Sequence, residues 1–314
     1  MAIFNRHKFK KIEVDQPIIF TGAIAFFSGI LMALTTAPVN AWLLAWVALV
    51  PLWVLVVSYE QPKIEEKKQK FFFLPSSFFL LPLLWGIGYH GLALSWIMGI
   101  HPMTWLGVPW WTSLAIALFC WVFITLWGAA LVVVWAWLFV IACNTLISGT
   151  GILPVSSKIS GTGILPVIRV LIGTALWCAL ESFWSQGSLW WTSLSYTQSP
   201  HNLAILHLGQ ISGPSAVTAA IVAVNGLIAE AYIERRRKKE EGRSKREEVR
   251  GKNLIAYIWP VSLCLILHIA GWTLYNRPLI QPEGTALKIG IIQGNIPNEI
   301  KFESKGWRRA LEGY

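Results

Sequence analysis

Long apolar stretches dominate this sequence and constrain its fold more than any other feature. A helix needs about 20 mainly apolar residues to cross the roughly 30 Å hydrocarbon core of a bilayer. The chain is 55% hydrophobic and only 13% charged, whereas soluble domains are about 25% charged. The sequence therefore predicts an all-α polytopic membrane protein with about seven transmembrane helices, at Pro17–Leu34, Ala41–Ser58, Phe71–Ile97, Pro109–Cys143, Val167–Gln186, Leu203–Ile233 and Leu254–Tyr275.

Lysine and arginine occur in every second gap between these stretches. They precede the first stretch and recur in the segments 59–70, 144–166 and 234–253. The intervening gaps contain neither residue and are Thr35–Asn40, Met98–Val108 and Gly187–Asn202. Because basic loops stay on the cytoplasmic side, we expect a cytoplasmic N-terminus, three cytoplasmic loops and an exterior C-terminal segment. The net charge of +10 then reflects topology, and we expect no nucleic-acid partner.

The segment 276–314 differs from the apolar stretches that form residues 1–275. Leu287–Ile296 is a short apolar run that ends in a polar turn at Gly294, Asn295 and Pro297, as buried strands of soluble domains do. We therefore expect a transmembrane domain over 1–275 and the start of an exterior α/β domain over 276–314. The chain ends soon after this strand, so we expect that domain to be incomplete.

Two features suggest a site at the exterior end of the helices. Tryptophans gather there, as in Trp110, Trp111, Trp190 and Trp191, and form either an interfacial aromatic belt or a cleft that admits a lipid chain. Glu181 lies near the exterior end of the fifth stretch. A charge at a helix centre costs roughly 2.5–3.5 kcal/mol, so this carboxylate has either a structural hydrogen-bonding role or a functional one.

The residues by themselves show no active site. The four cysteines lie in or beside apolar runs without CxxC spacing, which disfavours a disulfide framework or a zinc site. No two histidines share the i, i+4 face that a helix-borne metal site uses, and nucleophile and phosphate-loop motifs are missing from the sequence. We expect no metal and no cofactor.

Four segments resemble the apolipoprotein N-acyltransferase family. They correspond to its first helical hairpin, to the region around the fifth and sixth stretches, and to the opening strand and loop of its nitrilase-like domain. The segments are Thr35–Trp53, Ala175–Pro200, His207–Ala231 and Ala286–Ser304. Three positions depart from the family pattern: Trp184 stands where the family often has Arg, Leu189 replaces a Pro before Trp190, and Phe302 replaces a Trp.

The resemblance implies a bacterial inner-membrane enzyme in which an exterior nitrilase-like domain is anchored on eight helices. It implies transfer of an acyl chain from a phospholipid, through a cysteine thioester, to the N-terminal diacylglyceryl-cysteine of an apolipoprotein. Covalent catalysis of this kind divides one difficult acyl transfer into two steps, and donors aimed at the oxyanion lower both barriers. The family triad is Glu, Lys and Cys.

The triad has no counterpart in 1–314, because no Cys follows Tyr275. We expect it beyond Tyr314, expect a helix to begin near Glu303, and expect this chain to be inactive alone. The remaining candidates, for a lipid cleft or for structural roles, are Glu181, Trp190, Tyr196, Gln198, Gln293 and Asn295. Two alternatives stay open: a non-catalytic polytopic scaffold or transporter, and one half of a split enzyme.

Overall fold

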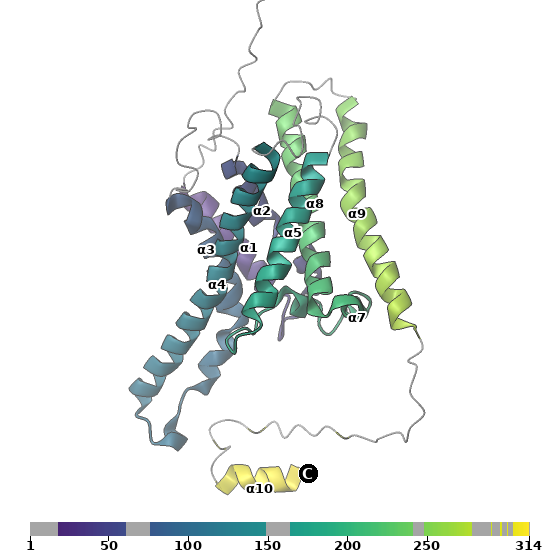
Figure 1. The fold of residues 1–314 in the computed structure, drawn as a ribbon. Helices are drawn as coiled ribbons and strands as arrows, with labels where there is room; N and C mark the ends of the chain where they lie inside the picture. The colour runs from purple at the N-terminus through teal and green to yellow at the C-terminus, as the bar shows by residue number, and fades with distance from the viewer. Residues whose placement is uncertain are drawn as a thin grey trace, which may run out of the picture.

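The protein is a bundle of long helices joined by short helical turns (Figure 1). The computed structural model describes residues 18–60, 76–148, 164–240, 248–277 and 304–313, together with Gly290, Ile296 and Ile300. No β-strand occurs within these ranges. The elements are α1 (Ile18–Ala33), η1 (Trp42–Trp46), α2 (Val50–Glu60), α3 (Ser76–Ala93), η2 (Ser95–Ile100), η3 (Thr104–Leu106), α4 (Trp110–Ser148), α5 (Ile164–Trp184), η5 (Leu194–Gln198), α6 (Leu203–His207), α7 (Gly209–Ser212), α8 (Pro214–Glu240), α9 (Glu248–Tyr275) and α10 (Ser304–Gly313).

Four of the described helices are long and apolar enough to cross a membrane: α4, α5, α8 and α9. Shorter apolar helices lie at Ile18–Ala33, Trp42–Ser58, Phe78–Ala93 and Leu203–Ser212. The all-helical prediction for residues 1–275 is therefore confirmed within the described part of the chain. About seven transmembrane helices were predicted. Among the described residues, four helices have the length to span a membrane, and the other apolar helices are shorter.

Two of the predicted spans are interrupted. The stretch Ala41–Ser58 divides into η1 and α2, and Leu203–Ile233 divides into α6, α7 and α8. The second break falls at Gly213, whose φ of 67° is left-handed and is readily adopted only by glycine. Pro214 then begins α8, at a position where a missing N–H leaves no hydrogen bond unmade.

Helical structure extends into two of the segments that were predicted as cytoplasmic loops. Helix α4 continues to Ser148 and α5 begins at Ile164, so both helices extend into the segment 144–166. Helix α8 runs to Glu240 and α9 begins at Glu248, which extends helical structure into the charged segment 234–253. The remaining residues of these loops lie outside the described part of the chain.

The predicted strand Leu287–Ile296 lies almost wholly outside the described residues. Only Gly290 and Ile296 within it are described, and neither belongs to a strand. Gln293 and Asn295 fall among the residues that are not described. A helix does begin close to Glu303, because α10 starts at Ser304. The nitrilase-like start expected for 276–314 is thus not seen in the described residues.

Aromatic side chains fill the centre of the bundle. Trp53 of α2 is fully buried and packs 5.6 Å from the ring of Trp135 on α4, measured between centroids. Trp53 fits because the facing positions on α5 and α8 are Gly173 and Gly226, where an added Cβ would collide with or press on the indole. Small residues of this kind let membrane helices approach closely.

The bundle has two chemically distinct ends. We call the end that carries Trp96, Trp110, Trp111, Trp184 and Trp191 the aromatic end, and the end that carries Arg235–Arg237 the basic end. In Figure 1 the start of α4, with η2 and η3, reaches past the ends of α5 and α8 at the aromatic end. At 1.5 Å per residue, the 39 residues of α4 span about 58 Å, well beyond the roughly 30 Å of a bilayer core.

Candidate functional site

Glu181 organises the polar contacts at the aromatic end. Its side chain is only 6% exposed, and both carboxylate oxygens accept hydrogen bonds. Oε1 accepts from Trp177 Nε1 (3.2 Å) and from the backbone N–H of Leu194 (2.9 Å). Oε2 accepts from the hydroxyls of Ser193 (2.9 Å) and Thr218 (2.8 Å). A buried acid in a membrane helix needs such partners, and these four donors come from α5, α8 and the chain between α5 and α6.

The chain between α5 and α6, residues 185–202, folds back into the bundle. We call it the returning loop. Thr192, Ser193, Leu194, Ser195, Thr197 and Gln198 are all buried. Ser193 caps η5 by accepting a hydrogen bond from the backbone N–H of Ser195. Non-helical backbone at membrane depth is tolerated only where protein surrounds it, so its buried polar groups require the partners described here.

Helix α3 holds the loop from the other side. The hydroxyl of Tyr89 donates to the carbonyl oxygen of Thr192 at 3.2 Å. A 2.7 Å hydrogen bond joins His90 Nδ1 and Thr192 Oγ1. Both aromatic residues are 1% exposed, and His90 fits against α4 because residue 128 is a glycine, where an added Cβ would lie 2.5 Å from the imidazole.

A third set of contacts ties the end of the loop to η1 and α9. Gln198 donates from Nε2 to the carbonyl oxygen of Trp42 at 3.3 Å. Asn202 donates to Gln198 Oε1 at 2.9 Å and lies 3.1 Å from His268 Nε2. His268 Nδ1 lies 2.7 Å from the carbonyl oxygen of Cys264, so this nitrogen is the donor and Nε2 accepts from Asn202.

The predicted site residues are partly brought together. Glu181 and Gln198 both hold the returning loop, and Trp190 packs with its ring centroid 5.7 Å from that of His90. Tyr196 is 50% exposed and is not among the four donors that hydrogen-bond Glu181. Gln293 and Asn295 lie outside the described residues, so their placement stays a prediction.

Sequence reasoning missed several residues of this network. The missed residues are isolated polar side chains in apolar surroundings: Tyr89, His90, Asn202 and Thr218. They are far apart along the chain, so the sequence alone did not indicate that they lie close together. The available signal was their burial, because polar groups in a membrane helix face the protein interior. Two departures from the family pattern also have clear contacts: Trp184 donates to the carbonyl oxygen of Trp127 at 3.3 Å, and Leu189 packs on the small cluster around Leu94.

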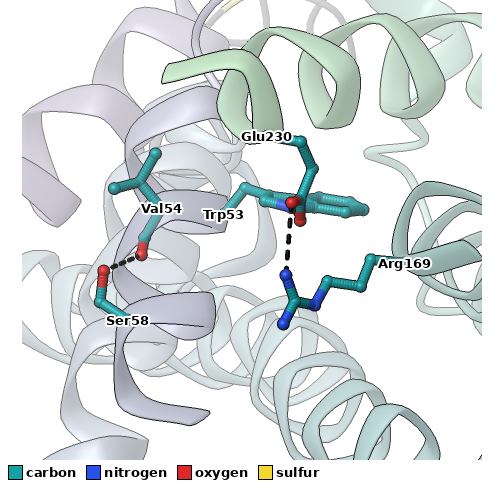
Figure 2. A network of polar contacts seen from close by, with 5 residues as sticks. All are labelled: Trp53, Val54, Ser58, Arg169 and Glu230. Carbon is teal, nitrogen blue, oxygen red and sulfur yellow. Dashed lines mark hydrogen bonds and ion pairs between the residues drawn. The ribbon is translucent and has the colours of Figure 1, made fainter. Parts of the chain in front are cut away.

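A separate polar cluster lies deeper in the bundle, towards the basic end. Glu230 of α8 accepts from Trp53 Nε1 at 3.2 Å and pairs with Arg169 of α5 at 3.4 Å (Figure 2). One turn earlier on α8, Asn225 accepts from the backbone N–H of Leu49 and donates to the carbonyl of Ala45. These contacts tie α2, η1 and α5 to α8, which makes α8 the central helix of the polar network.

This network can hold the returning loop in a fixed position. Within the described ranges, no three His, Cys, Asp or Glu side chains are grouped so as to hold a metal ion. The Glu181 oxygens are fully engaged by donors, and the thiol of Cys178, one turn away, lies 3.6 Å from the carbonyl of Ser215 instead. The arrangement is suited to holding a rigid loop at the aromatic end of the bundle.

The long apolar helices and the buried returning loop define a multi-pass α-helical membrane protein. Residues 28–227 match the family described as the apolipoprotein N-acyltransferase N-terminal domain. The chain belongs to this family, as the resemblance in its sequence indicated.

Individual relatives agree with the family match. The chain is 50% identical over 283 residues to the apolipoprotein N-acyltransferase of Nostoc sp. (strain PCC 7120). The aligned region covers 90% of this chain and 48% of that protein. The chain is 40% identical to the apolipoprotein N-acyltransferase of Synechocystis sp. (strain PCC 6803), over 90% of this chain and 51% of the relative. The chain therefore spans about half the length of the curated relatives it matches.

Proposed function

We propose that this chain forms the membrane part of an apolipoprotein N-acyltransferase of the bacterial inner membrane. The proposed reaction moves an acyl chain from a phospholipid to the N-terminal diacylglyceryl-cysteine of an apolipoprotein, through a cysteine thioester. In this proposal the described residues position the reaction and do not carry it out, since the Glu–Lys–Cys triad is expected outside them. The family match over residues 28–227 is the observation that carries the proposal.

The returning loop supports a platform role within this proposal. Glu181 of α5, Tyr89 of α3 and His268 of α9 hydrogen-bond the loop directly, and Thr218 of α8 holds the Glu181 carboxylate. A loop held from so many sides keeps its shape, and rigid supports are what positioned chemistry requires. The exposed side chains of Trp96, Trp191 and Tyr196 would then present an aromatic surface at the level of the lipid headgroups.

The proposed orientation places the aromatic end outside and the basic end in the cytoplasm. This follows the positive-inside pattern of the loops. Single cysteines introduced at Thr104 and at Arg236, in a variant without native cysteines, test it with a membrane-impermeant thiol reagent added to intact cells. Labelling at residue 104 and protection at residue 236 are expected, and the reverse pattern would refute the orientation.

A chimera tests the function. Residues 18–277 replace the matching region of the Nostoc sp. relative, and N-acylation of a diacylated lipopeptide is assayed with phospholipid as donor. We expect the chimera to be active and the chain alone to be inactive. A chimera that inserts and folds as the intact relative does, yet leaves the lipopeptide unmodified, would count against the proposal. Mixing the chain with the separately produced remainder of the relative tests the split-enzyme alternative.

A further inference from the structure

A small pocket lies between the second half of α2 and the last turns of α8, at the basic end of the bundle. Its volume is about 20 Å³, and a cavity of about 10–15 Å³ or more can hold one water molecule. The pocket therefore has room for one water-sized atom, such as a single oxygen of a larger anion. We call it the basic pocket, and its lining includes Val54, Val57 and Ser58 from α2 and Tyr232, Arg236 and Arg237 from α8.

The basic pocket has an apolar side and a cationic side. On the α2 side, Val54 and the fully buried Val57 form an apolar wall. On the α8 side, two guanidinium groups and a phenol line the pocket, from Arg236, Arg237 and Tyr232. Guanidinium N–H groups form strong, charge-assisted hydrogen bonds to phosphate and carboxylate oxygens, and a phenol hydroxyl adds a further donor. This combination suits an oxyanion.

Ser58 does not supply a donor to the pocket. Its hydroxyl donates to the carbonyl oxygen of Val54 at 2.7 Å, as Figure 2 shows. A serine hydroxyl has a single proton, so this bond engages the only one that Ser58 has. The donor side chains of the basic pocket therefore all come from α8, and recognition of an anion depends on that helix.

The charge around the basic pocket also favours an anion. From Tyr232 to Arg237 the chain carries three arginines and one acid, Glu234. Arg236 and Arg237 also take part in interactions within the protein. A guanidinium has five N–H donors, so each of these side chains can keep such an interaction and bind an anion at the same time.

The depth of the basic pocket follows from the register of α5 and α8, which run in opposite directions (Figure 1). Ser182 Oγ lies 3.3 Å from Ser215 Oγ, so these two residues are at the same level. The apolar part of α5, Leu165–Trp184, has 20 residues and covers about 30 Å, the thickness of the hydrocarbon core. Leu165 lies 17 residues before Ser182, and Tyr232 lies 17 residues after Ser215. Tyr232 is therefore level with the membrane boundary at the basic end.

This depth places the cationic side of the pocket among lipid headgroups. Tyrosine is enriched at membrane boundaries. Arg236 and Arg237 lie about one turn beyond Tyr232 on α8, about 6–8 Å farther out at 1.5 Å per residue, where the phosphates of a bilayer lie. Basic residues near the membrane surface attract anionic lipids. A lipid phosphate is therefore the oxyanion that the membrane brings to this level.

We propose that the basic pocket binds the phosphate group of an anionic phospholipid in the leaflet at the basic end of the bundle. One phosphate oxygen enters the pocket, and Arg236, Arg237 and the hydroxyl of Tyr232 donate hydrogen bonds to the phosphate. The pocket and the returning loop lie at opposite ends of the bundle, so the bound lipid is no substrate of the proposed reaction. The proposal does not rest on acyltransferase activity, and its failure and the failure of the proposed function are separate results.

Native mass spectrometry tests this site. The full chain is purified in detergent and titrated with dioctanoyl phosphatidylglycerol or, separately, with dioctanoyl phosphatidylcholine, whose choline neutralises the phosphate charge. We expect phosphatidylglycerol to bind about ten-fold more tightly, and equal affinities would refute recognition of an anionic lipid. Glycerol phosphate and inorganic phosphate, added in excess, should not displace the lipid. Displacement by either would overturn the assignment of the phosphate to a lipid.

Three arginine variants separate the pocket from general attraction to the basic end. Arg236→Gln and Arg237→Gln each remove one charge that lines the pocket. Arg235→Gln, the control, removes the same charge from an exposed neighbour that is not among the lining residues. We expect phosphatidylglycerol affinity to fall about ten-fold in the two pocket variants and by less than about two-fold in the control, whose exposed charge is screened by salt. Equal losses in all three would refute the pocket.

Tyr232→Phe tests the phenol hydroxyl separately. The variant keeps the ring of this 46% exposed residue and removes only the donor. Losing one hydrogen bond should weaken phosphatidylglycerol binding about 2–10-fold, and an unchanged affinity would refute the role of Tyr232. Thermal unfolding of each variant without added lipid checks that the bundle is intact, so that a loss of affinity reports the pocket.

Discussion

Glu181 Oε1 accepts the backbone N–H of Leu194 at 2.9 Å, across the thirteen residues in which the chain leaves α5 and folds back into the bundle. The same carboxylate binds Thr218 of α8 at 2.8 Å. One side chain therefore fixes the position of the returning loop relative to two long helices. These hydrogen bonds support the structural reading of Glu181, and the functional reading of its sequence position stays a prediction.

Replacing Glu181 should have effects that depend on which donors remain satisfied. In Glu181→Gln the amide oxygen can still accept from Trp177 and Leu194, and the Ser193 and Thr218 hydroxyls can rotate to accept from the amide nitrogen. We expect a loss of about 1 kcal/mol in the free energy of unfolding. Unfolding in mixed micelles of denaturing detergent measures it.

Glu181→Leu should cost much more. The N–H groups of Leu194 and Trp177 cannot rotate into acceptors, and two buried unpaired donors cost about 2–6 kcal/mol together. Ala179→Leu, on the exposed side of the same helix, should change stability by less than about 0.5 kcal/mol. If the Gln and Leu variants of Glu181 were equally stable, the carboxylate would not organise the loop.

The sequence predicted the helical class because apolar stretches and alternate basic gaps are local signals that need no knowledge of packing. It did not predict the break at Gly213, because the mainly apolar runs before and after it, Leu203–Leu208 and Ala216–Ile233, outweigh the short polar stretch between them in a hydropathy average. The break depends on a left-handed backbone at Gly213 followed by a proline, a combination whose effect a hydropathy window averages out.

The site was harder to predict than the fold. Glu181 and Gln198 could be selected, since each is a polar residue in apolar surroundings. Their partners could not, because Tyr89 and Thr192 are 103 residues apart along the chain and nothing local links them. Contacts between residues so far apart in the sequence arise from how the helices pack, and the hydrophobic pattern along the sequence does not predict that packing.

The Arg169–Glu230 pair should be costly to break on one side only. Arg169→Met removes the cation that lies 3.4 Å from the Glu230 carboxylate, and breaking a buried pair typically costs about 3–5 kcal/mol. The double variant Arg169→Met, Glu230→Gln removes both charges and keeps an oxygen for Trp53 Nε1 (Figure 2). We expect the double variant to be more stable than Arg169→Met alone.

The same detergent unfolding assay compares the two variants of the ion pair. Glu230→Gln alone completes the cycle and gives the coupling energy between the two side chains. Additive losses, with no coupling, would mean that Arg169 and Glu230 stabilise the bundle independently of each other.

Gly128 should control the placement of His90 against the returning loop. A Cβ at residue 128 would lie 2.5 Å from the imidazole, so Gly128→Ala should displace His90 and lengthen its bond to Thr192. We expect faster proteolysis within 185–202, measured by mass spectrometry of the fragments. Gly99→Ala, where an added Cβ meets nothing within 4 Å, should leave the cleavage rate unchanged, and the same rate in both variants would contradict the packing argument.

Gly271 should determine how closely α9 docks on α6. An added Cβ at residue 271 would collide with the carbonyl oxygen of Ala204, and backbone cannot move aside as a flexible side chain can. Gly271→Ala should therefore push α9 away from α6. His268 lies less than one turn before residue 271 on α9, so its contact with Asn202 should weaken. Gly209→Ala is the matched control, since an added Cβ there meets nothing within 4 Å. The distance between spin labels on the exposed positions Leu203 of α6 and Ile269 of α9 reports the separation: it should grow in Gly271→Ala and stay unchanged in Gly209→Ala, and equal distances would show that α9 does not depend on this contact.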